Sequence, residues 1–275
     1  MGTLTAHIEE AMEQTGSPLK HNAEVPDTAR AVQDMFGRVA RRYDLLNHLL
    51  SARFDTRWRS VTARELREVL ERPDSIAADL CCGTGDLTFA FARYSRGLVV
   101  GADFCHPMLQ VAGQKRLRLT SSSGDPRNGK GSRGTQFIEA DTVRLPFPDQ
   151  SLDLASMAFG FRNLANYDDG LNEIRRVLRP GGHIAILEFS RMQWPVLGPL
   201  FRFYFHRILP VVGTLISGES GPYQYLPDSV KNFPDQESLA RALREHGFVD
   251  VRYRNFLGGI AALHVGTRRA GTAGR

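Results

Sequence analysis

The stretch Asp79-Leu-Cys-Cys-Gly-Thr-Gly-Asp86, preceded by Ile76-Ala-Ala78, decides the fold of this 275-residue chain. Its apolar start predicts a buried strand, and Gly83 and Gly85 allow a tight turn that can approach a ligand closely. A helix predicted over residues 87–94 would direct the positive end of its dipole toward the same ligand. A strand, a glycine turn and a helix in this order are typical of a nucleotide-binding unit.

A carboxylate closes the next predicted strand, Leu98-Val-Val-Gly-Ala-Asp103. It lies about 20 residues beyond the glycine turn, where nucleotide-binding folds place the acid that binds the two ribose hydroxyls. The sequence therefore predicts a ligand with an adenosine-like nucleoside, held at its ribose by Asp103.

A missing glycine separates two classes of nucleoside ligand. The dinucleotide fingerprint Gly-x-Gly-x-x-Gly needs a third glycine so that the helix can approach the pyrophosphate, and Thr88 stands at that position. Asp79 and Asp86 flank the loop, and their charges would repel a pyrophosphate while suiting the α-ammonium group of S-adenosylmethionine. A methyltransferase is therefore favoured over a dehydrogenase. The alternative is a glycine turn that only connects a strand to a helix.

Composition and cysteine usage indicate one large α/β domain in a reducing compartment. The hydrophobic content of 42% supports a single large core in a chain of this length. The three cysteines, Cys81, Cys82 and Cys105, lie in or beside the predicted strands and favour a cytoplasmic location without disulfides. They lack a second ligand pair at metal spacing, so we expect no metal site.

The formal net charge of +5 is concentrated near the N-terminus, where residues 38–67 contain eight arginines and three acids. Such a cluster suits the phosphates of a nucleic acid or of an anionic membrane face, or forms an ordinary solvated helix face. No recognised nucleic-acid-binding pattern accompanies it, so nucleic acid is not an expected partner. The longest apolar region, residues 194–216, contains three prolines and two arginines and is not expected to span a membrane.

Hydrophobic periodicity divides the chain into a tail, a helical lid and an alternating strand and helix domain. We expect a mobile N-terminal tail over residues 1–28, a domain over residues 29–269 and a C-terminal tail over residues 270–275. Within the domain we expect a helical lid over residues 29–72 and a flexible polar loop over residues 120–134. Alternating elements predict a mostly parallel sheet with ligands at the carboxyl ends of its strands. Further strands are predicted at residues 135–141, 152–158, 183–189, 249–253 and 260–266, and further helices at residues 108–119, 167–178 and 235–246.

Five motifs in order give the chain a family resemblance. They are the glycine loop Asp79–Asp86, Leu145-Pro-Phe-Pro-Asp149, Phe159-Gly-Phe-Arg-Asn163, Arg176-Val-Leu-Arg-Pro-Gly-Gly182 and Leu187-Glu-Phe-Ser190. With them the chain resembles the ubiquinone/menaquinone biosynthesis C-methyltransferases over about residues 35 to 268. The resemblance implies a class I S-adenosylmethionine-dependent methyltransferase, which has a Rossmann-like, mostly parallel sheet with helices on both faces and an N-terminal helical lid.

The resemblance implies methylation of a ring carbon of a polyprenylated quinol. The double cysteine of the glycine loop favours demethylmenaquinol, and 2-methoxy-6-polyprenyl-1,4-benzoquinol of the ubiquinone branch is the alternative. A methyltransferase of another lipophilic small molecule and a basic binding module that only keeps the fold are two further candidates. Peripheral contact with the inner face of the cytoplasmic membrane is expected, and a homo-oligomer is left open.

The resemblance also implies the cofactor site. S-adenosylmethionine is expected to be the methyl donor, with Asp103 at its ribose and Asp141 at its adenine edge. The alternative for Asp141 is a carboxylate that only caps its own loop. The full predicted cofactor set is Asp79, Gly83, Thr84, Gly85, Asp103, Asp141 and Thr142.

Three residues are expected nearest to the chemistry: Arg162, Asn163 and Tyr43. Arg162 is too basic to act as a free general base, so it would stabilise a developing phenolate or position a water that takes the proton. Asn163 would hydrogen-bond the same oxygen, and Tyr43 would close over the site from the lid. The alternative for Arg162 is a structural salt bridge to an acid such as Asp44 or Asp86.

Overall fold

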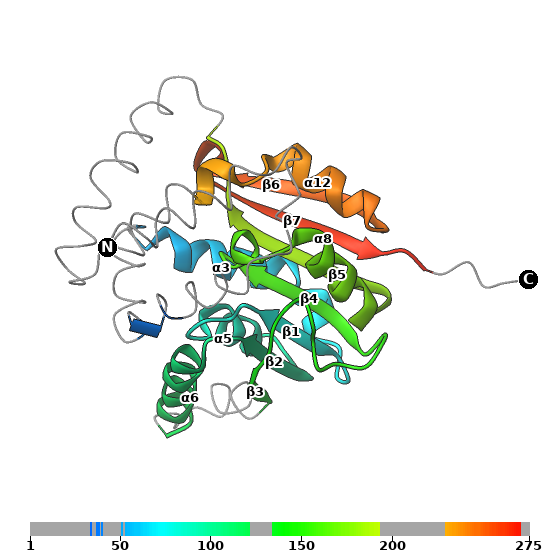
Figure 1. Cartoon of the computed structure of the whole chain (residues 1–275). Helices are drawn as coiled ribbons and strands as arrows, with labels where there is room; N and C mark the ends of the chain where they lie inside the picture. Colours follow the sequence, from blue (N-terminus) through cyan, green and yellow to red (C-terminus); the bar gives the residue numbers. More distant parts are fainter. Residues whose placement is uncertain are drawn as a thin grey trace, which may run out of the picture.

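A seven-stranded sheet forms the centre of the computed structural model, which describes residues 53–121, 134–192 and 229–270 together with Asp34, Gly37, Arg38, Ala40 and Ser51. The strand order is β3-β2-β1-β4-β5-β7-β6, and β7 alone runs antiparallel to its two neighbours (Figure 1). The strands are β1 (Ile76–Leu80), β2 (Leu98–Asp103), β3 (Thr135–Glu139), β4 (Leu152–Ala158), β5 (Leu178–Phe189), β6 (Phe248–Phe256) and β7 (Ala261–Arg268).

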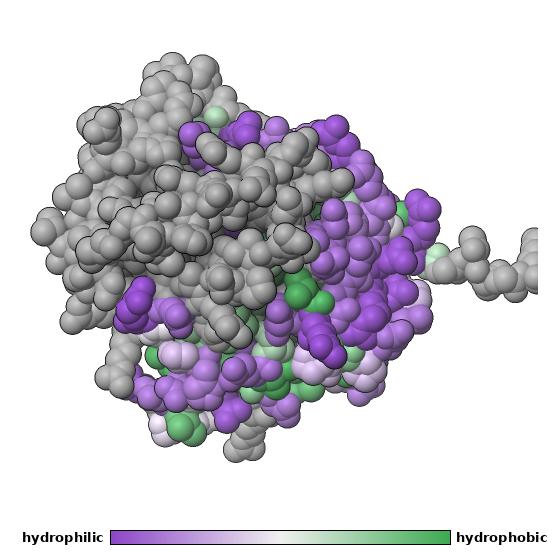
Figure 2. All heavy atoms as spheres, viewed as in Figure 1, coloured by the Kyte–Doolittle hydropathy of each residue, from purple (hydrophilic) through white to green (hydrophobic). Residues whose placement is uncertain are grey.

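Helices cover both faces of this sheet. One core joins strand residues such as Ala77, Leu154 and Ala185 to α3 (Phe54–Glu65), α4 (Arg67–Leu70) and α5 (Asp86–Ala92). The alternate strand residues pack with α8 (Tyr167–Val177) and α12 (Gln236–Glu245) in a second core. This alternation follows from the two-residue period of a strand whose two faces are both buried. Hydrophilic side chains prevail on the described surface of the face shown in Figure 2.

Local sequence signals begin the helices of the second core. The side chain of Asn166 accepts hydrogen bonds from the backbone N–H groups of Asp168 and Asp169 at the start of α8. Asp235 accepts from the N–H group of Ser238 at the start of α12 in the same way. These caps satisfy donors that the first turn of a helix leaves without a partner.

The strand order places a crevice at the carboxyl ends of β1 and β4. The chain runs outward from β1 through β2 to β3 and then returns to pair β4 with the other side of β1. Loops on the two sides of such a switch point diverge and leave room for a ligand. The prediction of a mostly parallel sheet with helices on both faces is confirmed.

Each strand and helix predicted within the described residues is present, with boundaries that differ by a few residues, and two differences have a clear structural cause. The segment Arg179-Pro-Gly-Gly182 separates the helix predicted at residues 167–178 from the strand predicted at residues 183–189. In the structure it lies inside β5, where the pairing with β4 shifts between Leu152 opposite Leu178 and Leu154 opposite His183. The extra residues are accommodated by a bulge, which Gly181 permits through its φ of 79°. The strand predicted to reach residue 141 ends at Glu139, because Asp141 turns back to pair with Arg144.

Several predictions concern residues that the structure does not describe. The tails at residues 1–28 and 271–275, most of the loop at residues 120–134 and most of the lid before α3 lie outside the described residues. The apolar region at residues 194–216 lies there as well. Among the described residues, no helix is both long and apolar enough to cross a bilayer.

We expect Leu171→Ala in α8 to lower the free energy of unfolding by about 2–5 kcal/mol, because the side chain is fully buried between α8 and the sheet. Leu117→Ala in α6 (His106–Ser121), where the leucine is 64% exposed, should change it by less than about 0.5 kcal/mol. Urea titration of both variants measures the difference. Equal losses would contradict the packing described for α8.

Candidate active site

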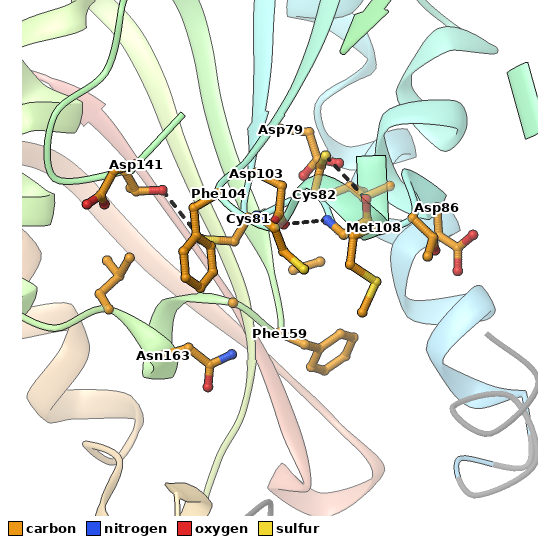
Figure 3. A pocket seen from close by; sticks show the side chains of 18 of the residues that line it. Asp79, Cys81, Cys82, Asp86, Asp103, Phe104, Met108, Asp141, Phe159 and Asn163 are labelled. Atoms are coloured by element: carbon orange, nitrogen blue, oxygen red, sulfur yellow. Dashed lines mark hydrogen bonds between the residues drawn. The ribbon is translucent and has the colours of Figure 1, made fainter. Parts of the chain in front are cut away.

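A pocket lies at the carboxyl ends of β1, β2 and β4, in the crevice at the switch point of the sheet (Figure 3). Its walls come from the glycine turn after β1, from the segment after β2 and from α3. Residues 141–142 and the segment around η1 (Phe161–Asn163) complete it. In Figure 3, Asp141 and Asp86 lie at opposite ends of the pocket, with Asp103 between them. Acidic side chains therefore stand at both ends of the pocket and between them.

The glycine turn adopts the conformation that its sequence predicts. Gly83 and Gly85 have φ values of 55° and 85°, which side-chain-bearing residues rarely adopt. A Cβ at Gly83 would meet no atom within 4 Å, so the backbone faces open space in the pocket wall. Gly85 instead packs under the ring of Phe137, which a Cβ would approach to 2.9 Å. Gly85 therefore shapes the turn and is not among the residues that line the pocket, so its place among the ligand contacts stays a prediction.

Asp79 is the most deeply buried acid of the pocket wall, with 1% of the residue exposed. Its Oδ2 accepts a hydrogen bond of 2.6 Å from the hydroxyl of Thr88. Its Oδ1 has no hydrogen-bond partner within the described part of the chain. Burial raises the pKa of Asp79 to about 7, although the Thr88 hydroxyl and the charge of Arg59 act against this rise. A cationic donor from a ligand would satisfy the remaining oxygen.

Asp103 connects the end of β2 to the glycine turn. Its Oδ2 accepts from the N–H group of Gly83 at 2.7 Å, and its Oδ1 accepts from the N–H group of Cys105 at 2.8 Å (Figure 3). Burial raises the pKa of Asp103, while these backbone hydrogen bonds favour its charged form. The carboxylate thus has a structural function in addition to lining the pocket.

Asp141 and Thr142 line the pocket, at the end opposite Asp86, and their contact with an adenine edge stays a prediction. Asp141 also accepts a hydrogen bond of 3.1 Å from the N–H group of Val143, so it caps its own loop as well. Thr142 contacts the thiol of Cys81, with 3.4 Å between Oγ1 and Sγ. The two roles weighed for Asp141 from the sequence are therefore compatible.

Asp86 has cationic partners of its own within the protein. Its Oδ1 accepts a hydrogen bond of 2.8 Å from Lys115, and its Oδ2 lies 3.9 Å from Nη1 of Arg59. Lys115 also donates to the hydroxyl of Thr84 at 3.0 Å. Of the two acids that the sequence offers to an α-ammonium group, Asp79 therefore fits that group better than Asp86.

Arg162 and Asn163 belong to the same 3-10 turn but face different surroundings. Asn163 lines the pocket, whereas Arg162 is not among the residues that line it. Nη1 of Arg162 donates to the carbonyl of Phe159 and to Oε1 of Glu188, both at 2.6 Å. The salt bridge weighed as an alternative for Arg162 therefore exists, with Glu188 as the partner in place of Asp86. Asp44 and the predicted catalytic residue Tyr43 lie outside the described residues.

Three free cysteines, Cys81, Cys82 and Cys105, line the pocket as thiols. Burial raises the pKa of Cys105 to about 11 and that of Cys81 further, so neither forms a thiolate at neutral pH. They therefore serve as small wall residues. Among the described residues, no group of three or more His, Cys, Asp or Glu side chains is arranged to hold a metal ion.

Sequence reasoning missed two charged residues at this site, Arg59 and Glu188. Arg59 belongs to α3 and lines the pocket, where it stacks over the ring of Phe159 at 5.2 Å. The spacing of Asp55 and Arg59 predicts an ion pair on a helix, but it does not show that this helix face meets the pocket. Glu188 is 26 residues from its partner Arg162, and no local pattern connects the two.

We expect Glu188→Gln to lower the free energy of unfolding by about 3–5 kcal/mol at pH 7, because the change leaves the buried guanidinium of Arg162 without a counter-charge. Glu237→Gln removes the same charge from an exposed pair with Arg244 and should cost less than about 1 kcal/mol. Urea unfolding of both variants tests this difference. Similar losses would show that the Arg162–Glu188 pair does not stabilise the turn.

Solved structures of low sequence identity share the fold. The [4+2]-cyclase SpnF has a TM-score of 0.61 at 14% identity, over 88% of this chain and 97% of that chain. A S-adenosylmethionine-dependent methyltransferase of Thermotoga maritima, described as a possible histamine N-methyltransferase, has a TM-score of 0.56 at 16% identity, over 86% of this chain and 99% of that chain. These similarities confirm the predicted class I methyltransferase fold, but they do not identify the substrate.

Comparison with known sequences shows the family. A sequence profile of the ubiE/COQ5 methyltransferase family matches residues 23–268. A demethylmenaquinone methyltransferase of Thermus thermophilus is 44% identical over 237 residues, covering 85% of this chain and 100% of the relative. One of Deinococcus radiodurans is 42% identical over 88% of this chain and 95% of the relative. A ubiquinone/menaquinone biosynthesis C-methyltransferase of Ectopseudomonas mendocina is 39% identical over 89% and 92%, respectively. The chain therefore belongs to the ubiE/COQ5 methyltransferase family and is a methyltransferase that uses S-adenosylmethionine as its methyl donor.

Proposed function

We propose that this protein methylates a ring carbon of a polyprenylated quinol, with demethylmenaquinol as its substrate. The observation that carries the proposal is that Asp79, Asp103 and Asp141 line one and the same pocket at the carboxyl ends of the parallel strands. Three acids in one pocket suit a cationic nucleoside and would repel a pyrophosphate. Membership of the ubiE/COQ5 family supports the reaction class.

In this proposal the pocket residues hold S-adenosylmethionine from one end to the other. Oδ1 of Asp79 accepts from the α-ammonium group, which satisfies the oxygen that has no partner among the described residues. Asp103 binds the ribose hydroxyls beside the backbone of Gly83 and Thr84, and Asp141 with Thr142 contacts the adenine edge. When bound, the donor supplies a methyl group already activated by its positive sulfur.

The protein's own contribution to the chemistry is to orient the quinol and to stabilise its charge. The amide of Asn163 donates to a ring oxygen, because Asn163 is the polar side chain of η1 that lines the pocket. Arg162 is bound to Glu188, so we propose that it acts indirectly, by fixing the turn that places Asn163 against that oxygen. The hydroxyl proton passes to water, and the ring carbon bonds to the methyl group as the methyl–sulfur bond breaks. The proton on that carbon then leaves to water as the aromatic ring is restored, and the ring oxygen takes a proton back from water, so that one proton is released for each methyl group transferred. Tyr43 is proposed to close over the ring.

The names of the relatives favour the menaquinone branch. The relatives of Thermus thermophilus and Deinococcus radiodurans, at 44% and 42% identity, are named demethylmenaquinone methyltransferase, whereas the relative of Ectopseudomonas mendocina, which is named for both quinones, is 39% identical. Because the family includes relatives named for both quinones, methylation of 2-methoxy-6-polyprenyl-1,4-benzoquinol is the second candidate reaction. Because a polyprenyl tail keeps a quinol in a bilayer, the proposal includes peripheral contact with the inner face of the cytoplasmic membrane.

We expect the protein to transfer a labelled methyl group to chemically reduced demethylmenaquinol in detergent, and to transfer less to the benzoquinol. Asn163→Ala should lower kcat about 100-fold, because it removes a donor to the developing oxyanion. Asp103→Asn should raise the KM for S-adenosylmethionine about 10- to 100-fold. Asp250→Asn, the same change at an exposed residue, is the matched control.

Transfer to the benzoquinol alone would move the protein to the ubiquinone branch. Binding of S-adenosylmethionine without transfer to either quinol would exclude both candidate substrates, but it would still support the assignment of the pocket to this cofactor.

A further inference from the structure

Arg59 is a cationic residue of the pocket wall that comes from α3. It is buried, with 8% of the residue exposed, and it lies near Asp86 at the end of the pocket opposite Asp141. The guanidinium of Arg59 contacts both Asp86 and Phe159, which are labelled in Figure 3. Arg59 therefore meets whatever part of a ligand occupies the end distal to the nucleobase.

The contacts of Arg59 leave part of its guanidinium without an acceptor. Nη1 serves both Asp55 and Asp86, and the guanidinium carbon lies 5.2 Å from the centre of the Phe159 ring. Within the described part of the chain, Nε and Nη2 donate to no acceptor. A planar guanidinium with two such nitrogens is suited to bind a carboxylate through two parallel hydrogen bonds.

Arg59 and Lys115 contact two acids at this end of the pocket. Arg59 pairs with Asp55 and lies near Asp86, and Lys115 pairs with Asp86. Asp79 is the additional acid nearby, and one of its oxygens has no partner among the described residues. This arrangement offers a cation and an anion side by side, which complements a zwitterionic amino acid better than either charge alone.

We propose that Arg59 binds the α-carboxylate of the methionine moiety of S-adenosylmethionine, beside Asp79 at the α-ammonium group. Arg59 is preferred to Lys115, because Arg59 lines the pocket whereas the ammonium of Lys115 is already bound to Asp86 and Thr84. The inference deepens the proposed function, since it rests on the same cofactor pocket. It makes α3 part of the cofactor site, and through the hydrogen bond from Ser51 to Asp55 it extends that site to the turn before α3.

The test compares two ligands that differ only in the carboxylate. Isothermal titration calorimetry with S-adenosylhomocysteine and with its decarboxylated analogue measures both dissociation constants for each variant. Arg59→Gln should weaken binding of S-adenosylhomocysteine about 10- to 100-fold and leave binding of the decarboxylated analogue within about twofold. Arg57→Gln, the same change at an exposed position of α3, should leave both constants unchanged.

A second variant covers the case in which Arg59→Gln unfolds because Asp55 loses its counter-charge. Asp55→Asn/Arg59→Gln removes both charges of the buried pair, a change that is often tolerated where the single change is not. It should show the same carboxylate-specific loss. Equal weakening of both ligands in the folded variants, or equal affinity of the wild-type protein for both ligands, would overturn the role of Arg59. Failure of the wild-type protein to bind either ligand would overturn the cofactor pocket itself, and with it the proposed function.

Discussion

The buried carboxyl group of Asp79 at the end of β1 is the constraint on which the rest of the pocket depends. An ionised carboxylate in such a place loses its hydration, and one hydroxyl from Thr88 replaces only part of it. Its pKa of about 7 expresses that cost in the absence of a ligand. A ligand with a cationic donor relieves the cost, so the pocket favours an aminoacyl nucleoside over a neutral or anionic one.

The surroundings of Asp79 are held rigidly by the two segments that meet above the sheet. Cys81 and Phe159 both have positive φ values, at 51° and 63°, which is unusual for residues with side chains. A Cβ at Gly160 would lie 2.4 Å from Cβ of Cys81, so only glycine lets the two segments approach this closely. Such strain persists only where surrounding packing fixes it, and the Arg162–Glu188 pair supplies one such anchor. The wall facing the ligand is therefore set before the ligand binds.

The sequence allowed us to place those pocket residues that lie at or just beyond the end of a strand in a continuous motif. Asp79, Gly83, Asp103 and Asp141 could be placed because carboxyl ends of adjacent parallel strands share one edge of a sheet. The bulge in β5 could not, because proline and two glycines predict a turn equally well.

Long-range pairing accounts for the residues whose surroundings sequence reasoning missed. Arg162 faces Glu188 instead of the pocket, and this depends on how η1 packs on the end of β5. Arg59 reaches the pocket because α3 packs beside α5 on one face of the sheet, which the helical period of α3 alone does not reveal. Local patterns specify the elements and their polar ends, whereas the partners of buried charges are determined by tertiary packing.

The most direct test of whether Asp79 binds the α-ammonium group is the number of protons released when S-adenosylhomocysteine binds. Calorimetry in buffers of different ionisation enthalpy gives this number at each pH. Because the pKa of Asp79 is raised to about 7 in the free protein, Asp79 must lose its proton to receive an ammonium group at lower pH. We expect release of about one proton at pH 6 and almost none at pH 8, and no such change in Asp79→Asn. Equal proton release at both pH values would contradict the assignment of the α-ammonium group to Asp79.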